Sequence, residues 1–373
     1  MPSPPTSLDA ESSDPEFLRA HSQFKSYTIN HFTYTNLRIF HHAHPTTSPR
    51  PSSNTAPAPL IVCIHGLGGS VAQFAPLLPH LTALAPVLAI DLPGCGRSAF
   101  AESSWDAYAP SALELLLDVV IADFRAERQP LVLVGHSMGS ALAARLASRR
   151  VQLQADRQIT KQADTHAPAA APHVAALIAL CPITLPISAH KAVQLRRLLW
   201  VPGWLFDLWR MWDRRGGTES ASVRRFVSGS SSSGNDAPEA SEELKAMQHT
   251  FNAQSRTPVW RRMAWGLLPA DAHENGESRG GLVGLDIWAG VRASVLLVGG
   301  EDDHVTLPGE VNRAADAVRG GDASGSQVVR TKILPCPANH TLLYDPRTVP
   351  EVVATINTFL GKQFSGVQID KWL

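Results

Sequence analysis

Short, continuous runs of apolar residues recur along the chain, and each ends at glycine, proline or a polar turn. Runs of this length fit β-strands that are buried on both faces, which is typical of parallel sheets. They predict strands at residues 60–64, 85–94, 130–137, 173–182, 293–302 and 328–335. Between Tyr27 and Phe40 apolar and polar residues alternate instead, which predicts an opening hairpin with one face toward water.

Stretches with helical periodicity separate the predicted strands. They cover residues 107–128, 138–150, 307–318 and 348–361. Strands that alternate with helices predict a mostly parallel α/β sheet with helices on both faces. We expect this core to comprise residues 25–182 and 286–361.

One long interval, residues 183–285, breaks the alternation. It has no clear strand, holds six of the nine tryptophans and includes a serine-rich, low-complexity run at 228–243. This pattern predicts a helical cap that is inserted over the sheet and interrupted by a disordered loop. We predict that the Pro/Ser-rich segment 1–24 is a disordered tail and that residues 362–373 form a C-terminal tail.

Composition narrows the class of protein. The chain has 373 residues, with 33 basic and 33 acidic side chains. This balance argues against a nucleic-acid partner, because binding to phosphates requires a basic face. The chain has no run of 18 apolar residues and no recognisable signal or transit peptide, and its four cysteines lack paired spacing. We therefore expect a cytoplasmic protein with reduced thiols.

The strongest chemical signal is Gly-His-Ser-Met-Gly at residues 135–139, between a predicted strand and a predicted helix. A serine on a sharp strand-to-helix turn needs small residues two positions to either side, because the backbone there packs closely against its neighbours. Such a turn lifts the serine hydroxyl clear of the sheet. The motif therefore predicts Ser137 as a nucleophile.

A nucleophilic serine needs a base, and the base needs an acid to orient it. Glu301, Asp302 and Asp303 lie at the end of the predicted strand at 293–302 or directly after it, and His340 follows the last predicted strand. These positions predict a triad of Ser137, one of the three acids and His340. The alternative for His340 is an ordinary histidine in a surface loop.

Acyl transfer also develops an oxyanion, which requires N–H donors that are already in place. The amide of Met138, at the start of the helix after Ser137, is one candidate. The glycine-rich loop at 65–69 offers the second, with the amide of Leu67 preferred and that of Gly68 next. This loop lacks the final glycine of the dinucleotide-binding pattern, which disfavours a role in holding phosphate.

Together these motifs resemble the α/β-hydrolase fold superfamily. The resemblance rests on H-G-L-G-G at 65–69, D-L-P-G-C-G-R-S at 91–98, G-H-S-M-G at 135–139, the acids after Gly299-Gly300 and the pair Asn339-His340. It implies Ser137 as nucleophile, His340 as base, Asp303 or Asp302 as acid, and the amides of Leu67 and Met138 as oxyanion donors. Such chemistry needs no cofactor.

Of the two acids, Asp303 is preferred. In the superfamily the acid is typically followed two positions later by an apolar residue, and then by a proline near the next helix. Asp303 is followed in this way by Val305 and Pro308, whereas Asp302 would place His304 at the apolar position. Asp302 then fits a solvated or loop-capping carboxylate.

The tryptophans of the predicted cap have three possible roles. Residues 198–212 place tryptophan and leucine at helical spacing, with arginines beside them. This face could pack onto the core, line an acyl or aromatic pocket, or contact a membrane surface. Trp204 and Trp209 are the candidate substrate-binding residues, and membrane contact is the less favoured alternative.

These residues predict a serine hydrolase that cleaves an ester, thioester or amide through an acyl-enzyme. The substrate is expected to be a small molecule with an apolar acyl or aromatic part, and a carboxylic ester is preferred. One alternative is a non-catalytic ligand-binding or interaction protein on the same fold. Another is an acyltransferase, suggested by the weak spacing of His340 and Asp345. We expect no metal site, since the run His41, His42, His44 has no carboxylate or cysteine nearby.

Overall fold

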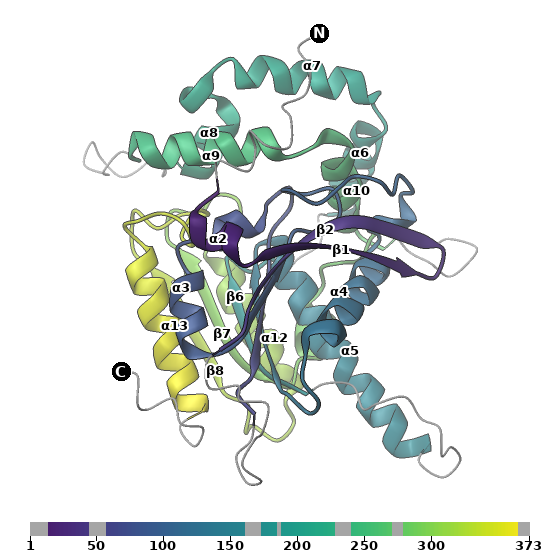
Figure 1. Ribbon diagram of the computed structural model, residues 1–373, viewed down its shortest axis with the longest axis vertical. Coiled ribbons are helices and arrows are strands. Elements are labelled where there is room, and N and C mark those ends of the chain that lie inside the picture. Colours follow the sequence, from purple (N-terminus) through teal and green to yellow (C-terminus); the bar gives the residue numbers. More distant parts are fainter. Residues whose placement is uncertain are drawn as a thin grey trace.

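The computed structural model has one eight-stranded sheet, with helices on both faces and a further group of helices at one end (Figure 1). The structure describes residues 14–44, 57–160, 173–184, 188–227, 240–270 and 279–364. Among these residues, every helix is too short or too polar to cross a lipid bilayer.

The strand order in the sheet is β1-β2-β4-β3-β5-β6-β7-β8. An antiparallel hairpin of β1 (Ser22–Ile29) and β2 (Phe32–His42) forms one edge, and β2 pairs antiparallel with β4. The other strands pair in parallel: β3 (Leu60–Ile64), β4 (Val87–Ile90), β5 (Leu131–His136), β6 (Val174–Leu180), β7 (Ser294–Gly300) and β8 (Val329–Leu334). The predicted hairpin and the mostly parallel sheet are confirmed.

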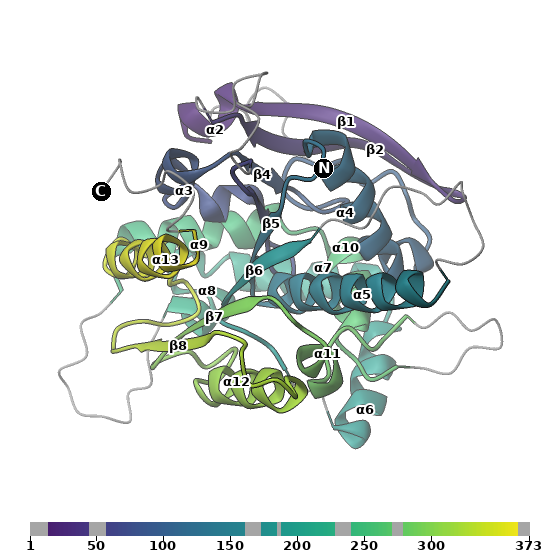
Figure 2. The same cartoon turned by 90° about the horizontal axis from the view of Figure 1, so that it is seen from below.

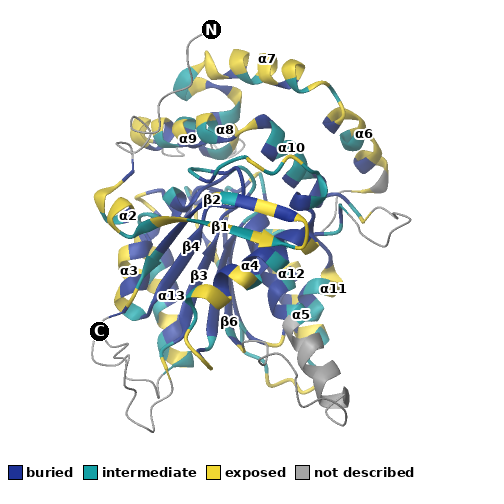
Figure 3. Ribbon diagram, turned by 45° about the vertical axis from the view of Figure 1, so that its right-hand side comes forward, coloured by how far each residue is buried: buried dark blue, intermediate teal, exposed yellow. Residues whose placement is uncertain are grey.

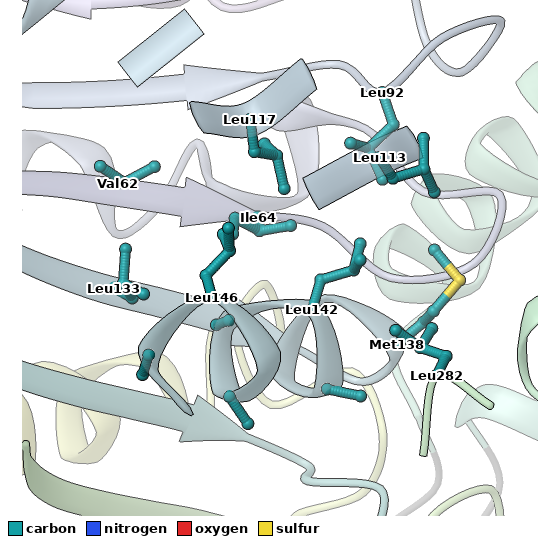
Figure 4. Packing of buried hydrophobic residues seen from close by; sticks show 14 of the residues in the cluster. Val62, Ile64, Leu92, Leu113, Leu117, Leu133, Met138, Leu142, Leu146 and Leu282 are labelled. Carbon is teal, nitrogen blue, oxygen red and sulfur yellow. The ribbon is translucent and has the colours of Figure 1, made fainter. Parts of the chain in front are cut away.

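The central strands are apolar along their whole length because helices cover both faces. One face packs against α4 (Pro110–Phe124), α5 (Met138–Thr160), α11 (Leu285–Ala289) and α12 (Gly309–Gly321). The other packs against α3 (Leu78–Leu84) and α13 (Val349–Gln363), and Figure 2 shows these two helices across the sheet from α4 and α5. In the first layer Leu142 and Leu146 of α5 lie over Ile64 and Leu133 of the sheet (Figure 4).

Between β6 and β7 the described residues form helices and no strand, as predicted for the insertion. Besides α11, these helices are α6 (Ala189–Leu199), α7 (Gly203–Arg214), α8 (Ala221–Val227), α9 (Glu242–Gln254) and α10 (Thr257–Gly266), with a short 3-10 helix at Gly217–Glu219. The predicted low-complexity loop extends too far, because Ser241 caps α9 and Glu242 and Glu243 form its first turn. Residues 228–239 lie outside the described part of the chain.

The prediction of a disordered tail over residues 1–24 is wrong for residues 14–24. These residues form α2 (Glu16–Ala20) and the start of β1. Leu18 is buried, and the Asp14 carboxylate pairs with Arg38 at 2.9 Å and with Arg97 at 2.6 Å. Ion pairs with residues far along the chain thus hold this segment on the sheet.

The predicted C-terminal tail also starts too early, because α13 continues to Gln363. Residues 1–13 and 365–373, the rest of the two predicted tails, lie outside the described residues.

Candidate active site

A sharp turn joins β5 to α5 and carries Ser137. The backbone of Ser137 has a φ of 52°, in the left-handed region that costs a non-glycine residue about 1 kcal/mol or more. Hydrogen bonds hold this conformation: the Ser137 amide donates to Leu180 O at 2.9 Å, and the Ser137 carbonyl accepts from the amide of Ser140 at 2.9 Å. Ser137 is half-buried, whereas the residues on either side of it are buried.

The two glycines of the motif allow the turn to pack this closely. A Cβ on Gly135 would overlap the carbonyl oxygen of Gly139, and a Cβ on Gly139 would overlap the carbonyl oxygen of Ile64 on the neighbouring strand. Both obstacles are backbone atoms, so they cannot move aside as a flexible side chain could. The requirement for small residues at these positions is therefore steric.

We expect Gly139→Ala to lower the free energy of unfolding by at least about 2 kcal/mol, because the methyl group must displace backbone of β3 or α5. Urea unfolding followed by circular dichroism measures this change. Gly320→Ala in α12 is the matched control, since a Cβ there meets nothing within 4 Å and alanine favours the helix by up to about 1 kcal/mol. Equal stability of the two variants would contradict the steric explanation.

The loops after β7 and β8 bring Asp303 and His340 together. His340 Nδ1 lies 2.8 Å from Asp303 Oδ2, and both side chains are buried. With the Nδ1 proton donated to the carboxylate, the lone pair of His340 is on Nε2. The ring is thereby oriented to accept a proton at Nε2.

Asp303 is also held by its own loop. Its Oδ1 accepts from the amides of Val305 and Thr306, each at 2.8 Å, and its Oδ2 accepts from the Thr306 hydroxyl at 2.7 Å. Burial raises the pKa of Asp303, but the hydrogen bond and charge of His340 and the Thr306 donors outweigh it and lower the pKa to about 2. The carboxylate is therefore ionised at neutral pH.

For Asp302, the other candidate acid, the described residues show no hydrogen bond or ion pair with His340. It is half-buried, its backbone amide donates to Ala338 O at 2.9 Å, and its carboxylate raises the pKa of the nearby Cys336 thiol through a hydrogen bond. The structure thus brings His340 together with Asp303 and leaves Asp302 in a loop-stabilising position.

Ser137 and His340 come from distant parts of the chain, but a hydrogen bond from the side chain of His136 links the two loops. His136, the residue before Ser137, lies with its Nε2 3.0 Å from the carbonyl oxygen of His340, and the two imidazole rings are 4.8 Å apart. Among the described residues no hydrogen bond joins Ser137 Oγ to His340.

Sequence reasoning missed His136 and Thr306. Burial, followed by the charge of His340, lowers the pKa of His136 to about 3, so the ring is neutral and donates from Nε2 to the His340 carbonyl. His136 thus positions the backbone of His340, and Thr306 positions Asp303. The signal for His136 lay inside the Gly-His-Ser-Met-Gly motif, but the pattern leaves that position unspecified.

Two backbone amides were predicted to bind an oxyanion. Met138 is the first residue of α5, where helix amides have no partner within the helix, and its side chain is buried beside Leu282 (Figure 4). Leu67 lies in the loop after β3, which His65 fixes by bonding Gly66 O at 2.7 Å and the Leu92 amide at 2.9 Å. Within the described residues neither the Leu67 amide nor the Met138 amide donates to another group of the chain.

Ligand atoms of His136, Cys181 and His340 lie within 4.8 Å of one another. Metal binding would require a thiolate, but burial and then the charge of Asp303 raise the pKa of Cys181 well above its ordinary value. His340 also uses its Nδ1 to bond Asp303. The donor set therefore does not fit a metal ion.

The insertion reaches the site through residues that the sequence did not single out. A Cβ on Gly68 would lie 2.6 Å from Ser255 Oγ and 3.3 Å from Trp260 Cδ1, so these residues cover the loop after β3. The ring of Phe226, in α8, lies 5.6 Å from the ring of His340. Trp260 and Phe226 thus bring aromatic rings to the site.

The structure leaves Trp204 and Trp209 exposed, by 62% and 58%. The explanation that this apolar face packs onto the core is wrong, because its large side chains are exposed, and Figure 3 shows most of α7 in the colour of exposed residues. The spacing identified one apolar face correctly, but periodicity cannot show which side of a helix meets the rest of the protein.

A parallel α/β sheet with a serine on the turn after β5 and an Asp–His pair on the loops after β7 and β8 defines the architecture of an α/β hydrolase. Residues 61–354 match the model of the alpha/beta hydrolase family. Since this match covers most of the chain, the protein belongs to that family.

Individual relatives are distant. An abhydrolase domain-containing protein of Schizosaccharomyces pombe is 27% identical over 219 residues, which cover 57% of this chain and 53% of the relative. The chain thus spans about half the length of that curated relative.

Solved structures support the same fold. The match to an esterase from Thermogutta terrifontis (15% identity, TM-score 0.57) extends over 99% of that chain and 91% of this one. The match to the carboxylesterase CesB from Bacillus subtilis (15% identity, TM-score 0.56) extends over 96% of that chain and 95% of this one. The match to a bromoperoxidase from Bacillus anthracis (14% identity, TM-score 0.57) extends over 99% of that chain and 91% of this one. At these identities the likeness extends to the fold alone.

Proposed function

We propose that the protein is a serine hydrolase that cleaves a carboxylic ester through an acyl-enzyme, with Ser137, His340 and Asp303 as its triad. The observation that carries this proposal is the 2.8 Å bond between Asp303 and His340, next to the strained turn that presents Ser137. A binding protein without catalytic activity has no need of a buried, oriented acid–base pair beside such a turn.

The proposed reaction proceeds in two halves. His340 Nε2 takes the proton of Ser137 Oγ as the oxygen attacks the ester carbonyl, and the carbonyl electrons move onto the oxygen, where the Leu67 and Met138 amides stabilise the oxyanion. Collapse expels the alkoxide, which takes the proton from His340. Water then attacks the acyl-enzyme by the same route and releases the acid. Throughout, Asp303 holds the tautomer of His340 and stabilises its cation.

Two aromatic side chains support a substrate with an apolar part. Phe226 packs against the His340 ring, and Trp260 lies over the loop that would donate to the oxyanion. In this proposal the helical insertion acts as a cap, and these rings replace Trp204 and Trp209 as the residues nearest to the reacting group. The apolar part could be acyl or aromatic.

Acyl transfer receives less support. Asp345, the second residue of the suggested acyltransferase spacing, is buried and pairs with the Arg347 guanidinium at 2.7 Å. It also accepts from the Arg347 amide at 3.0 Å. These bonds fit a role in fixing the turn before α13.

A fluorophosphonate probe tests the proposal, because only a serine activated by a base attacks phosphorus quickly. We expect labelling of the folded wild type, loss of labelling in Ser137→Ala, and no labelling of heat-denatured protein. A p-nitrophenyl ester series of increasing chain length should then show kcat/KM rising above that of the acetate. Absence of labelling in folded wild type would favour the non-catalytic binding protein.

A further inference from the structure

The exposed large hydrophobic residues of this protein are concentrated on α6 and α7. Nine of the fourteen such residues among those described lie between positions 193 and 212, and each is 41% to 68% exposed. We call this set the tryptophan face: Val193, Leu198, Trp200, Trp204, Leu205, Leu208, Trp209, Met211 and Trp212. Figure 3 shows α7 as a mostly exposed helix at the outer edge of the molecule.

The orientation of α7 is the reverse of that expected for a helix in water. Its inner side is formed by Phe206, Arg210 and Asp213. Arg210 donates to Thr257 Oγ1 at 3.0 Å and to Ser255 O at 2.7 Å, so a charged residue anchors the helix to the protein. A surface helix normally turns its apolar stripe inward and its charges toward solvent.

The apolar residues of α7 form one continuous outer surface. With about 3.6 residues per turn, they occupy an arc of about 160° on the side away from the Arg210 contacts. They are Trp204, Leu205, Leu208, Trp209, Met211 and Trp212. A contiguous apolar surface of this kind on a protein marks a contact with a partner or a membrane.

The charges around the tryptophan face are mostly positive. Residues 188–216 contain six basic and two acidic side chains, in a chain with no net charge. One of the two acids, Asp213, is buried and accepts from the Ser222 amide at 3.2 Å. Lys191, Arg197 and Arg215 are exposed.

Tryptophan beside lysine and arginine is the composition of helices that lie in a bilayer interface. A second copy of the chain fits this surface less well, because it would bring like charges together. The sequence of segment 228–239 contains no large apolar side chain that could bind to such a surface. Charge and composition therefore favour a membrane surface over a second copy of the chain or segment 228–239 as the partner of this face.

We propose that the tryptophan face docks onto a bilayer surface that contains anionic phospholipid. The indole rings lie at the boundary between headgroups and acyl chains, and Lys191, Arg197 and Arg215 contact the lipid phosphates and carboxylates. This docking does not depend on the proposed hydrolysis, so it can be tested without any measurement of activity.

Liposome flotation of the full chain tests the proposal. Wild type and Ser137→Ala should float equally with phosphatidylcholine vesicles that contain phosphatidylserine, and more weakly without phosphatidylserine or at high salt. The triple variant Trp204→Ala, Trp209→Ala, Trp212→Ala should partition at least about tenfold less, because three exposed indoles leave the interface. Its side chains are exposed, so circular dichroism should show an unchanged fold.

Two further variants separate the apolar and charged contributions. Phe24→Ala with Ile333→Ala removes exposed apolar side chains from β1 and β8 and should leave flotation unchanged. Lys191→Gln with Arg197→Gln and Arg215→Gln should weaken binding to phosphatidylserine vesicles by about fivefold per charge, with little effect on neutral vesicles.

Several outcomes would overturn the proposal. Wild type that stays with the soluble fraction at low salt would do so, as would a tryptophan triple variant that floats like wild type. Sedimentation equilibrium supplies the third: a wild-type dimer that the triple variant abolishes, without vesicle binding, would make the tryptophan face a contact between two copies.

Discussion

If the proposed mechanism holds, replacing Ser137 by alanine is expected to lower kcat for a p-nitrophenyl ester by roughly a hundred-thousandfold to a millionfold, by analogy with a serine protease that loses its nucleophile. The variant keeps the Asp303–His340 pair and the oxyanion donors, but no oxygen remains to form the acyl-enzyme. Binding of substrate should persist, so KM should change little. Steady-state kinetics with highly purified protein measures both quantities.

Ser148→Ala is the control for this substitution. Ser148 is further along α5, where its hydroxyl faces Gly290 of the neighbouring loop. We expect its kcat to remain within about threefold of wild type, since Ser148 lies about three helical turns along α5 from Ser137. Residual activity of Ser137→Ala above one tenth of wild type would place the nucleophile elsewhere.

The second large effect is expected at the acid. Asp303→Asn should reduce kcat by roughly a thousandfold to ten thousandfold, because an amide no longer stabilises the His340 cation and can favour the wrong tautomer. Asp302→Asn should cost less than about tenfold, since the Asp302 carboxylate hydrogen-bonds the Cys336 thiol and not His340. Both variants are assayed on one ester, with circular dichroism to confirm folding.

The comparison of the Asp303→Asn and Asp302→Asn variants distinguishes a catalytic acid from a structural one. Loss of activity in Asp303→Asn with an unchanged unfolding midpoint supports the role in catalysis. Asp303 also binds the Val305 and Thr306 amides, so Thr306→Val serves as a check on loop integrity: it should retain far more activity than Asp303→Asn. A larger loss in Asp302→Asn than in Asp303→Asn would transfer the role to Asp302.

The sequence predicts the sheet well because its signal is local. A strand such as β5, buried on both faces, must be apolar at every position, and that run is visible without knowledge of its neighbours. The glycines around Ser137 are visible for the same reason, since the turn between β5 and α5 requires them at fixed spacing.

What the sequence could not predict depends on contacts between distant residues. Asp14 looked like part of a polar tail, but it pairs with Arg38 and Arg97, which no local pattern connects to it. Likewise, the helical spacing of residues 204–212 shows that one face is apolar, yet it does not reveal that Arg210 holds the opposite side against Ser255. Hydrogen bonds to backbone carbonyls have no sequence signature.

The separation of the proposed catalytic groups along the chain bears on biosynthesis. His136 touches the carbonyl of a residue 204 positions later, and the Asp–His pair forms only when the loops after β7 and β8 are both present. Domains fold as their residues emerge from the ribosome. In the proposed mechanism, Ser137 is therefore synthesised before its base, and the nascent protein remains inert toward cellular esters until the segment that carries His340 has also emerged.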